Sequence, residues 1–173
     1  MHFVRNTFYK TGCGKLEDFK MHNKNNKILV IGIGNEFRGD DGAGIVCARK
    51  IREKVNSKAF VIESNGDGAK LMEAWKRFDK VILIDSISIG SKPGSIRKFN
   101  GYDAGFPKAN SKPSSHLFSV ADAIMTSKIL NTLPENLVIY GIEGKLYEYG
   151  SKISGEVSKS IEKLVKVIEK DIR

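Results

Sequence analysis

Two adjacent acids, Asp40 and Asp41, lie in the stretch IGIGNEFRGDDGAG of residues 31–44. A glycine-rich turn that follows an apolar run commonly binds a phosphate through its backbone amides. Two carboxylates in such a turn would repel a phosphate, whereas they suit a cation, a shared proton or an activated water. A further acid, Asp85, follows the apolar run VILI later in the chain. The residue types therefore predict carboxylate chemistry in this turn.

Imidazole chemistry in the body of the chain would fall on His116, in the segment PSSH. The other two histidines, His2 and His22, lie near the N-terminus. Asp41, Asp85 and His116 form an oxygen and nitrogen donor set that suits a divalent metal with open positions, whereas a structural zinc site needs four ligands. The two acids could instead share a proton and activate water, as paired carboxylates do.

Each of these residues also has an interpretation without chemistry. Acids at a helix start commonly cap free amides, which would account for Asp40 and Asp41. An Asp at a strand end, such as Asp85, often caps a loop, and a histidine at a helix start is often only exposed. The convergence of Asp41, Asp85 and His116 from separate parts of the chain is what favours a functional site.

The elements that would position the acids are apolar strands. KILVIGIG, AFVIES and KVILIDSI are apolar nearly throughout, which is typical of buried parallel strands. Apolar residues at helical spacing follow the first strand (Ile45, Ala48, Ile51 and Val55) and the second (Leu71, Met72, Trp75 and Phe78). In a doubly wound sheet the first and third strands commonly lie side by side, about 5 Å apart, with a ligand crevice between their carboxyl ends. Asp41 and Asp85 are therefore expected to face each other across this crevice.

The rest of the chain completes one sheet. Residues 86–94 are too short for the crossover between parallel strands, so the next strand, SIRKF, is expected to run antiparallel at an edge. After a loop over 100–115, a helix is expected with Ser114 or Ser115 as its N-cap. NLVIYGIEG predicts the last strand, and an apolar stripe predicts a closing helix from about Glu156. The pattern indicates a three-layer α/β/α sandwich with a five-stranded, mostly parallel sheet and one antiparallel strand.

Length and composition favour a single domain. The chain has 173 residues, of which 40% are hydrophobic, and we expect a flexible leader over 1–26 and one α/β domain over 27–173. No apolar run suits a signal peptide or a membrane span, so we expect a cytoplasmic protein without a membrane partner. The two cysteines, Cys13 and Cys47, are expected to be free thiols.

The formal charge of +9 does not indicate a nucleic-acid partner. Residues 1–27 contain six Lys and Arg against two acids, which accounts for +4 of this charge. The remaining lysines are scattered over polar helix faces and do not alternate with stacking aromatic residues. A lysine-rich solvated surface is the preferred interpretation. The sequence gives no oligomeric state.

A competing interpretation is a Rossmann-like nucleotide-binding domain without enzymatic activity. Gly32 and Gly34 match the first two glycines of a dinucleotide fingerprint, and Glu63 mimics the acid that binds ribose. The third glycine is missing, because Phe37 occupies its position, and the adjacent acids would oppose a pyrophosphate. No P-loop motif occurs in the chain.

With these residues in view, the chain resembles the hydrogenase maturation proteases, which trim the C-terminus of the large subunit of nickel-iron hydrogenases. The resemblance runs from about Lys27 to the C-terminus. Its blocks, in order, are VIGIGNEFRGDDGAG, VILIDSISIG, SSHLFSVADAI and VIYGIEG with the closing helix. It implies a five-stranded mixed sheet with one antiparallel strand.

The resemblance also implies the chemistry. The family's metal-recognising residues map onto Asp41, Asp85 and His116, and some members have Glu in place of Asp41. Nickel would arrive already held by cysteine thiolates of the large-subunit precursor and would not bind tightly to the free enzyme. Asp41 and Asp85 are the expected catalytic residues, with hydrolysis of either the aspartic type or the metal-assisted type. A chaperone that recognises the nickel site without cutting would use the same triad.

Overall fold

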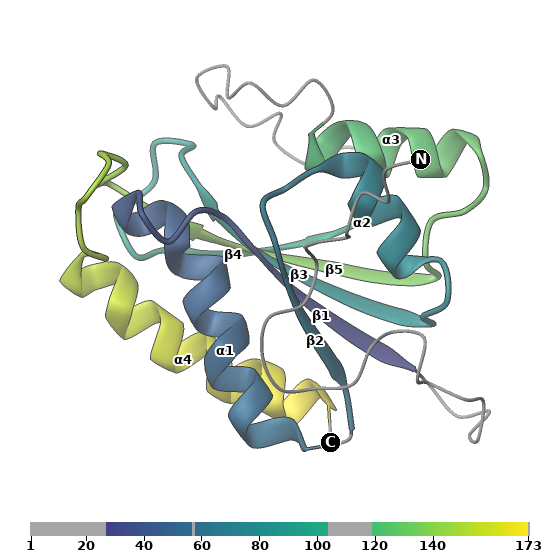
Figure 1. The fold of residues 1–173 in the computed structure, drawn as a ribbon, viewed down its shortest axis with the longest axis horizontal. Coiled ribbons are helices and arrows are strands. Elements are labelled where there is room, and N and C mark those ends of the chain that lie inside the picture. Colours follow the sequence, from purple (N-terminus) through teal and green to yellow (C-terminus); the bar gives the residue numbers. More distant parts are fainter. Residues whose placement is uncertain (1–26, 57, 104–118, 173) are drawn as a thin grey trace, which may run out of the picture.

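The computed structural model describes residues 27–56, 58–103 and 119–172. These residues form one five-stranded sheet between two layers of helices (Figure 1). The strands are β1 (Ile28–Ile33), β2 (Phe60–Ser64), β3 (Lys80–Ile87), β4 (Ile96–Asn100) and β5 (Asn136–Glu143). The helices are α1 (Ala43–Val55), α2 (Gly68–Trp75), α3 (Val120–Ile129) and α4 (Gly155–Ile172), with a 3-10 turn, η2 (Gly39–Gly42), before α1. The predicted sandwich is confirmed.

The strand order is β2-β1-β3-β5-β4. β1 pairs in parallel with both β2 and β3, and β3 pairs in parallel with β5. β4 pairs antiparallel with β5 at the edge of the sheet, as the short connection after β3 predicts. The first and third strands are therefore neighbours, which is the arrangement that brings the two acidic segments to one edge.

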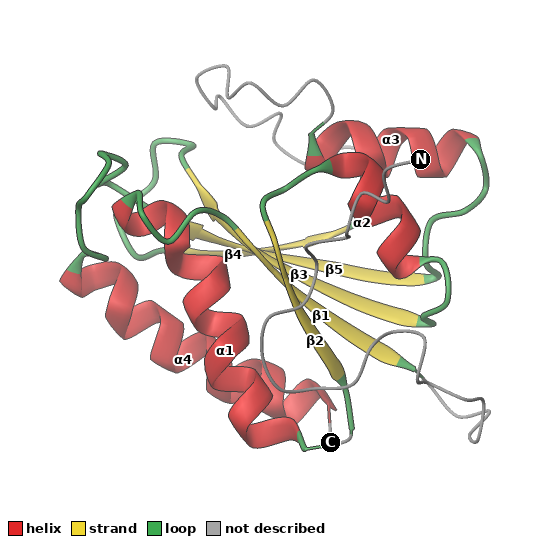
Figure 2. Ribbon diagram, in the orientation of Figure 1, coloured by secondary structure: helices red, strands yellow, loops and turns green. Residues whose placement is uncertain are grey.

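The two helical layers cover opposite faces of the sheet (Figure 2). α1 and α4 pack over the face that carries Val30, Ile82 and Ile84. α2 and α3 pack over the face that carries Leu83 and its alternating neighbours. Because successive strand side chains point to opposite faces, Asp85 points to the same side as Leu83, the side of α2 and α3.

The start of α3 differs from the prediction. Ser119 has an extended backbone conformation and is the N-cap, so the expectation of an N-cap at Ser114 or Ser115 is wrong. The Ser119 hydroxyl accepts from the backbone amide of Asp122, and the Asp122 carboxylate accepts in return from the Ser119 amide. This capping box satisfies two free amides and fixes the helix start at Val120.

Glycines let α1 approach the sheet closely. A Cβ built on Gly44 would lie 2.8 Å from the Ile33 nitrogen, and it would lie closer still to the carbonyl oxygens of Ile33 and Ile84. A Cβ on Gly32 would lie 2.5 Å from the Ala48 Cβ. The start of α1 therefore rests directly on the backbone of β1 and β3.

Two further expectations concern the core and the membrane. Cys47 is a free thiol and is fully buried in α1, where burial raises its pKa to about 12; Cys13 lies outside the described residues. Among the described residues, no helix is both long enough and apolar enough to cross a membrane. The leader over 1–26 also lies outside the described residues.

Candidate active site

Asp41 lies in η2, where the chain turns from the end of β1 into α1. Its backbone is held on both sides, because the Asn35 amide donates to the Asp41 carbonyl oxygen and the Asp41 amide donates to Arg38. Gly34, with a φ of +139°, lies against the Asp41 carbonyl, where a Cβ would clash. The loop between β1 and η2 is thus closed on itself, which fixes the backbone from which the Asp41 side chain extends.

Asp85 lies near the carboxyl end of β3 and is half-buried. Its Oδ1 atom accepts a hydrogen bond of 2.8 Å from the backbone amide of Ser86. Burial, and after it the neighbouring Asp41 carboxylate, raise the pKa of Asp85 to about 7. The hydrogen bond from the Ser86 amide acts in the opposite direction. This carboxyl therefore keeps its proton to a higher pH than an exposed aspartate does.

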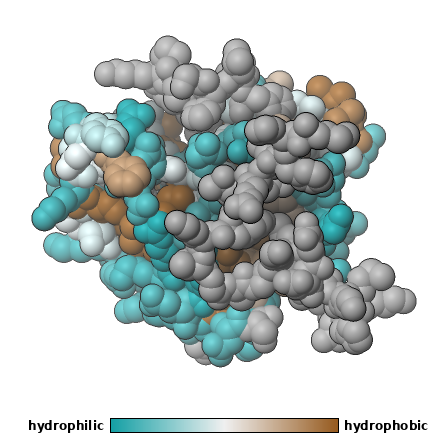
Figure 3. Space-filling model, viewed as in Figure 1, coloured by the Kyte–Doolittle hydropathy of each residue, from teal (hydrophilic) through white to brown (hydrophobic). Residues whose placement is uncertain are grey.

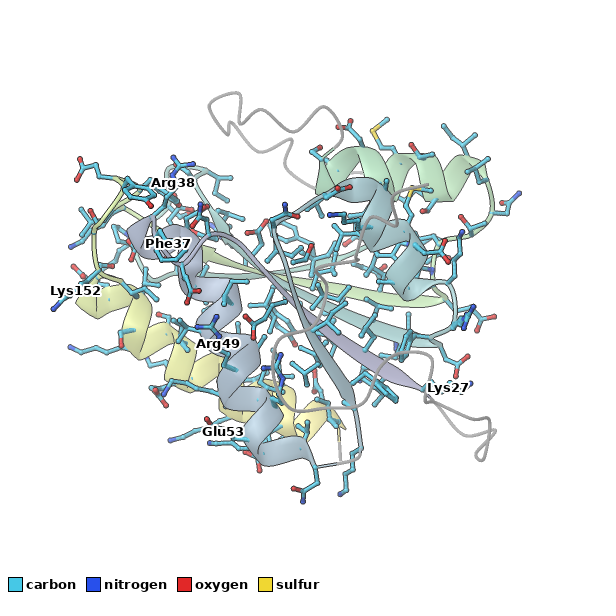
Figure 4. The ribbon with its side chains drawn as sticks, in the orientation of Figure 1. Lys27, Phe37, Arg38, Arg49, Glu53 and Lys152 are labelled. Atoms are coloured by element: carbon cyan, nitrogen blue, oxygen red, sulfur yellow. The ribbon has the colours of Figure 1, made fainter. Side chains whose placement is uncertain are left out.

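Asp41 and Asp85 lie close enough to interact, because the charge of Asp41 raises the pKa of Asp85. The Asp41 carboxyl also has a raised pKa, caused by burial and opposed by the Arg38 guanidinium and the Asn35 amide. Arg38 lies on the loop before α1 (Figure 4). The Asp41 carboxylate raises the proton affinity of Asp85, and a carboxyl pair of this kind is suited to hold one proton or to bind a cation.

Asp40 has a different place from its neighbour. It is fully buried, and its carboxylate accepts hydrogen bonds from the amides of Lys145, Leu146 and Ser154 and from the Ser154 hydroxyl, at 2.7 to 3.0 Å. Burial acts to raise the pKa of Asp40, but these hydrogen bonds outweigh it and hold the pKa below its usual value. Asp40 is therefore not a helix cap; it joins η2 to the loop between β5 and α4.

His116, the third member of the predicted triad, lies outside the described residues. The structure does place the start of α3, at Val120, four residues later in the chain. A Cβ built on Gly66 would lie 3.4 Å from a methyl group of Ile33 and 4.0 Å from one of Val120. The first turn of α3 thus lies beside the carboxyl end of β1. In the described part of the chain, no group of three or more His, Cys, Asp or Glu side chains could hold a metal.

The contacts of Glu63 do not favour a nucleotide site. Arg49 donates to one Glu63 carboxylate oxygen at 2.9 Å, and Arg52 donates to the other at 3.1 Å. Both oxygens that would receive ribose hydroxyls are thus engaged by helix α1. Gly32 and Gly44 lie where α1 packs against the backbone of the sheet. These two glycines therefore do not leave an open surface for a pyrophosphate.

Two supporting groups could not be found by sequence reasoning. The Tyr147 hydroxyl donates to the Ile87 carbonyl at 2.8 Å and lies 3.0 Å from the Ser86 hydroxyl, so it supports the strand end that carries Asp85. Glu143 is almost fully buried and accepts from the amide of Gly90 at 3.0 Å, which orders the connection after β3. These contacts join distant loops, and no periodicity or motif in the sequence signals them.

A cavity of about 280 Å³ lies elsewhere, at the C-terminal ends of α1 and α4. Lys54, Asn56, Lys58 and Glu169 are among its lining residues. The acids of interest lie at the N-terminal end of α1, so this cavity has no part in their chemistry.

Comparison with known proteins identifies the family. The family model described as hydrogenase maturation protease matches residues 45–171, which is more than half of the chain. The chain belongs to the hydrogenase maturation protease family. The match includes β3 with Asp85 and begins four residues after Asp41. Membership of this family makes the chain a peptidase by class.

Curated and solved relatives agree with the family. A putative hydrogenase maturation protease of Methanocaldococcus jannaschii is 29% identical over 87% of this chain and 99% of its own length. Hydrogenase expression/formation protein HupD of Rhodobacter capsulatus is 22% identical over 87% of this chain and 73% of its own length.

Solved structures of the family have the same fold. The hydrogenase maturating endopeptidase HybD of Escherichia coli has a TM-score of 0.70 and 20% identity, covering 82% of this chain and 89% of that one. The hydrogenase maturation protease HybD of Thermococcus kodakarensis has a TM-score of 0.60 and 27% identity, covering 85% of this chain and 99% of that one.

Proposed function

We propose that this family member is a cytoplasmic endopeptidase that removes the C-terminal peptide from the large-subunit precursor of a nickel-iron hydrogenase. The observation that carries the proposal is a pair of interacting carboxyl groups in a hydrogenase maturation protease fold: Asp41 in the turn after β1, and Asp85 near the carboxyl end of the neighbouring strand β3. Peptide hydrolysis needs one group that accepts a proton and one that donates it, and such a pair supplies both.

Nickel enters this proposal as part of the substrate. Asp41, Asp85 and His116 would add two carboxylates and one imidazole to nickel that the precursor already holds through thiolates, and oxygen and nitrogen donors suit this borderline metal. His116 remains a prediction. Recognition of nickel would position the scissile bond, so that only loaded precursor is cut.

The carboxyl pair also indicates how protons would move. The ionised carboxylate would accept a proton from the attacking water as its oxygen bonds to the scissile carbonyl carbon. The protonated partner would give its proton to the amide nitrogen as the C–N bond breaks. With a pKa of about 7, Asp85 is the better proton donor near neutral pH, and Asp41, next to Arg38, is the better acceptor. If the nickel of the substrate activates the water instead, the same two acids would hold and orient it.

The deciding experiment incubates the protein with nickel-loaded and with nickel-free precursor and measures the product mass. We expect trimming of the loaded form alone, and at least a 100-fold loss of rate in Asp41→Asn and Asp85→Asn. Glu53→Gln is the matched control, because Glu53 is an exposed acid on α1 directed away from the site (Figure 4). Loaded precursor that binds but stays intact would instead support the non-cutting chaperone.

A further inference from the structure

Two loops form one connected unit beside Asp41. They are residues 34–38, between β1 and η2, and residues 144–154, between β5 and α4. The Gly150 amide donates to the Phe37 carbonyl at 2.7 Å, and Arg38 donates through Nε to the Tyr147 carbonyl at 3.3 Å. Asp40 joins the same loops from beneath through its buried carboxylate. These hydrogen bonds join the two loops into one unit.

An exposed aromatic pair lies on the outer surface of this unit. The rings of Phe37 and Tyr149 stack with centroids 6.3 Å apart and an interplanar angle of 28°. Phe37 is 60% exposed and Tyr149 is 79% exposed. By contrast, Trp75, Phe78 and Tyr140 are buried. Figure 3 shows pale and brown side chains among hydrophilic ones over this region, at the left of the view.

The pair is not needed to close the loops. Asp40 and the Gly150 amide already hold them together, and the Asn35 side chain accepts from the Phe37 amide at 3.0 Å. An exposed pair adds little loop stability, because most of its apolar area stays in water. Rigid aromatic side chains with a fixed backbone are instead what binding surfaces use, since little conformational entropy is lost on contact.

We propose that Phe37 and Tyr149 bind an apolar segment of the precursor next to its scissile bond. This inference rests on the proposed function and identifies where the substrate lies. Phe37 is four residues before Asp41, and its loop is bonded to Asp41 because the Asn35 amide donates to the Asp41 carbonyl oxygen at 3.2 Å. A precursor chain bound at Asp41 would pass beside this loop, where two stacked rings suit an apolar side chain.

Kinetics on loaded precursor test the role of the pair. In Phe37→Ala and Tyr149→Ala we expect KM to rise about tenfold while kcat stays within twofold, because the rings bind substrate and transition state equally. Phe37→Leu and Tyr149→Phe should restore most of the loss. Ile129→Ala is the matched control, because Ile129 is 78% exposed but lies on α3. Unchanged KM in both alanine variants would overturn the proposal while leaving the peptidase function intact.

Photo-crosslinking identifies the occupant directly. With p-benzoylphenylalanine in place of Phe37 or Tyr149, we expect crosslinks to precursor residues within about five positions of the cleavage site. The same replacement at Ile129 should give none there. Crosslinks elsewhere on the precursor, or none at all, would contradict the proposal. If crosslinks form but the wild-type protein never cleaves, the docking surface stands and the proposed function falls.

Discussion

Two identical side chains in adjacent positions do different work in this protein. Asp40 points inward to amides and a hydroxyl that only an acceptor can satisfy, and its pKa is lowered. Asp41 is partly buried, and burial raises its pKa. Sequence analysis placed Asp41 in the expected site, and that role stays a prediction. A helix cap was the alternative interpretation for Asp40, whereas in the structure its carboxylate bonds to the loop between β5 and α4.

The first prediction at this scale concerns Asp40. Asp40→Asn replaces one accepting oxygen by an NH2 group that faces donors, so we expect the free energy of unfolding to fall by about 3 kcal/mol. Trp75, fully buried and the single tryptophan, reports unfolding by its fluorescence in urea. Because the pKa is lowered in the folded state, the stabilisation by Asp40 is complete above about pH 4 and is lost as the pH falls further.

Asp41→Asn serves as the comparison for Asp40→Asn. Neutralising a carboxyl whose pKa is raised removes an unfavourable charge, so stability should stay the same or increase slightly. A loss as large as that of the Asp40 variant would show that both acids are structural.

Asp85 should destabilise the fold at neutral and alkaline pH. Its pKa is raised from 3.8 to about 7, so the folded state binds the proton more tightly and stability falls as the pH rises from about 4 to 7. Each pH unit corresponds to about 1.4 kcal/mol, which gives an upper limit of about 4 kcal/mol. Asp85→Asn should therefore unfold at higher urea than the wild type at pH 8, with a much smaller difference at pH 4.5. If the variant and the wild type differed in stability by the same amount at both pH values, ionisation of Asp85 would not be the cause of the pH dependence.

At the scale of elements, apolar runs and short connections were enough to predict every described strand and the antiparallel direction of β4. The core positions of α1 and α4 were also predicted, since one apolar face repeats at helical spacing in each. The start of α3 differs, because the serines after Pro113 match the N-cap pattern equally well, whereas the capping box that forms joins Ser119 and Asp122. Contacts between loops, such as those of Asp40 and Glu143, follow from tertiary structure alone and could not be predicted.

The contact between α1 and the sheet gives the prediction at this scale. Gly44→Ala places a methyl group against the backbone of β1 and β3, which cannot move aside without breaking hydrogen bonds between the strands. We therefore expect the free energy of unfolding to fall by about 3 kcal/mol or more, as in the larger core substitutions. Gly155→Ala is the control, because a Cβ there meets nothing within 4 Å. Urea unfolding followed by Trp75 fluorescence measures the stability of both variants. A Gly44→Ala protein as stable as the control would mean that α1 can shift from the sheet.

At the scale of the whole molecule, a doubly wound sheet does not by itself decide between a nucleotide and a peptide as ligand. The first glycine-rich turn is the same kind of element in both cases. What separates them here is local: the acids in the turn, the packing of Gly32 and Gly44 against backbone, and the engagement of Glu63 by two arginines. The fold provides an edge where strand ends meet, and the side chains at that edge determine its chemistry.

The position of β5 has a consequence for the synthesis of the chain. β5 lies between β3 and β4 in the sheet, although the ribosome makes it after both of them. Until residues 136–143 emerge, β3 keeps one edge unpaired and β4 lacks the strand with which it pairs in the described structure. A nascent chain that stops before that point would present an apolar strand edge to chaperones or to other chains. The last strand to be translated therefore closes the sheet.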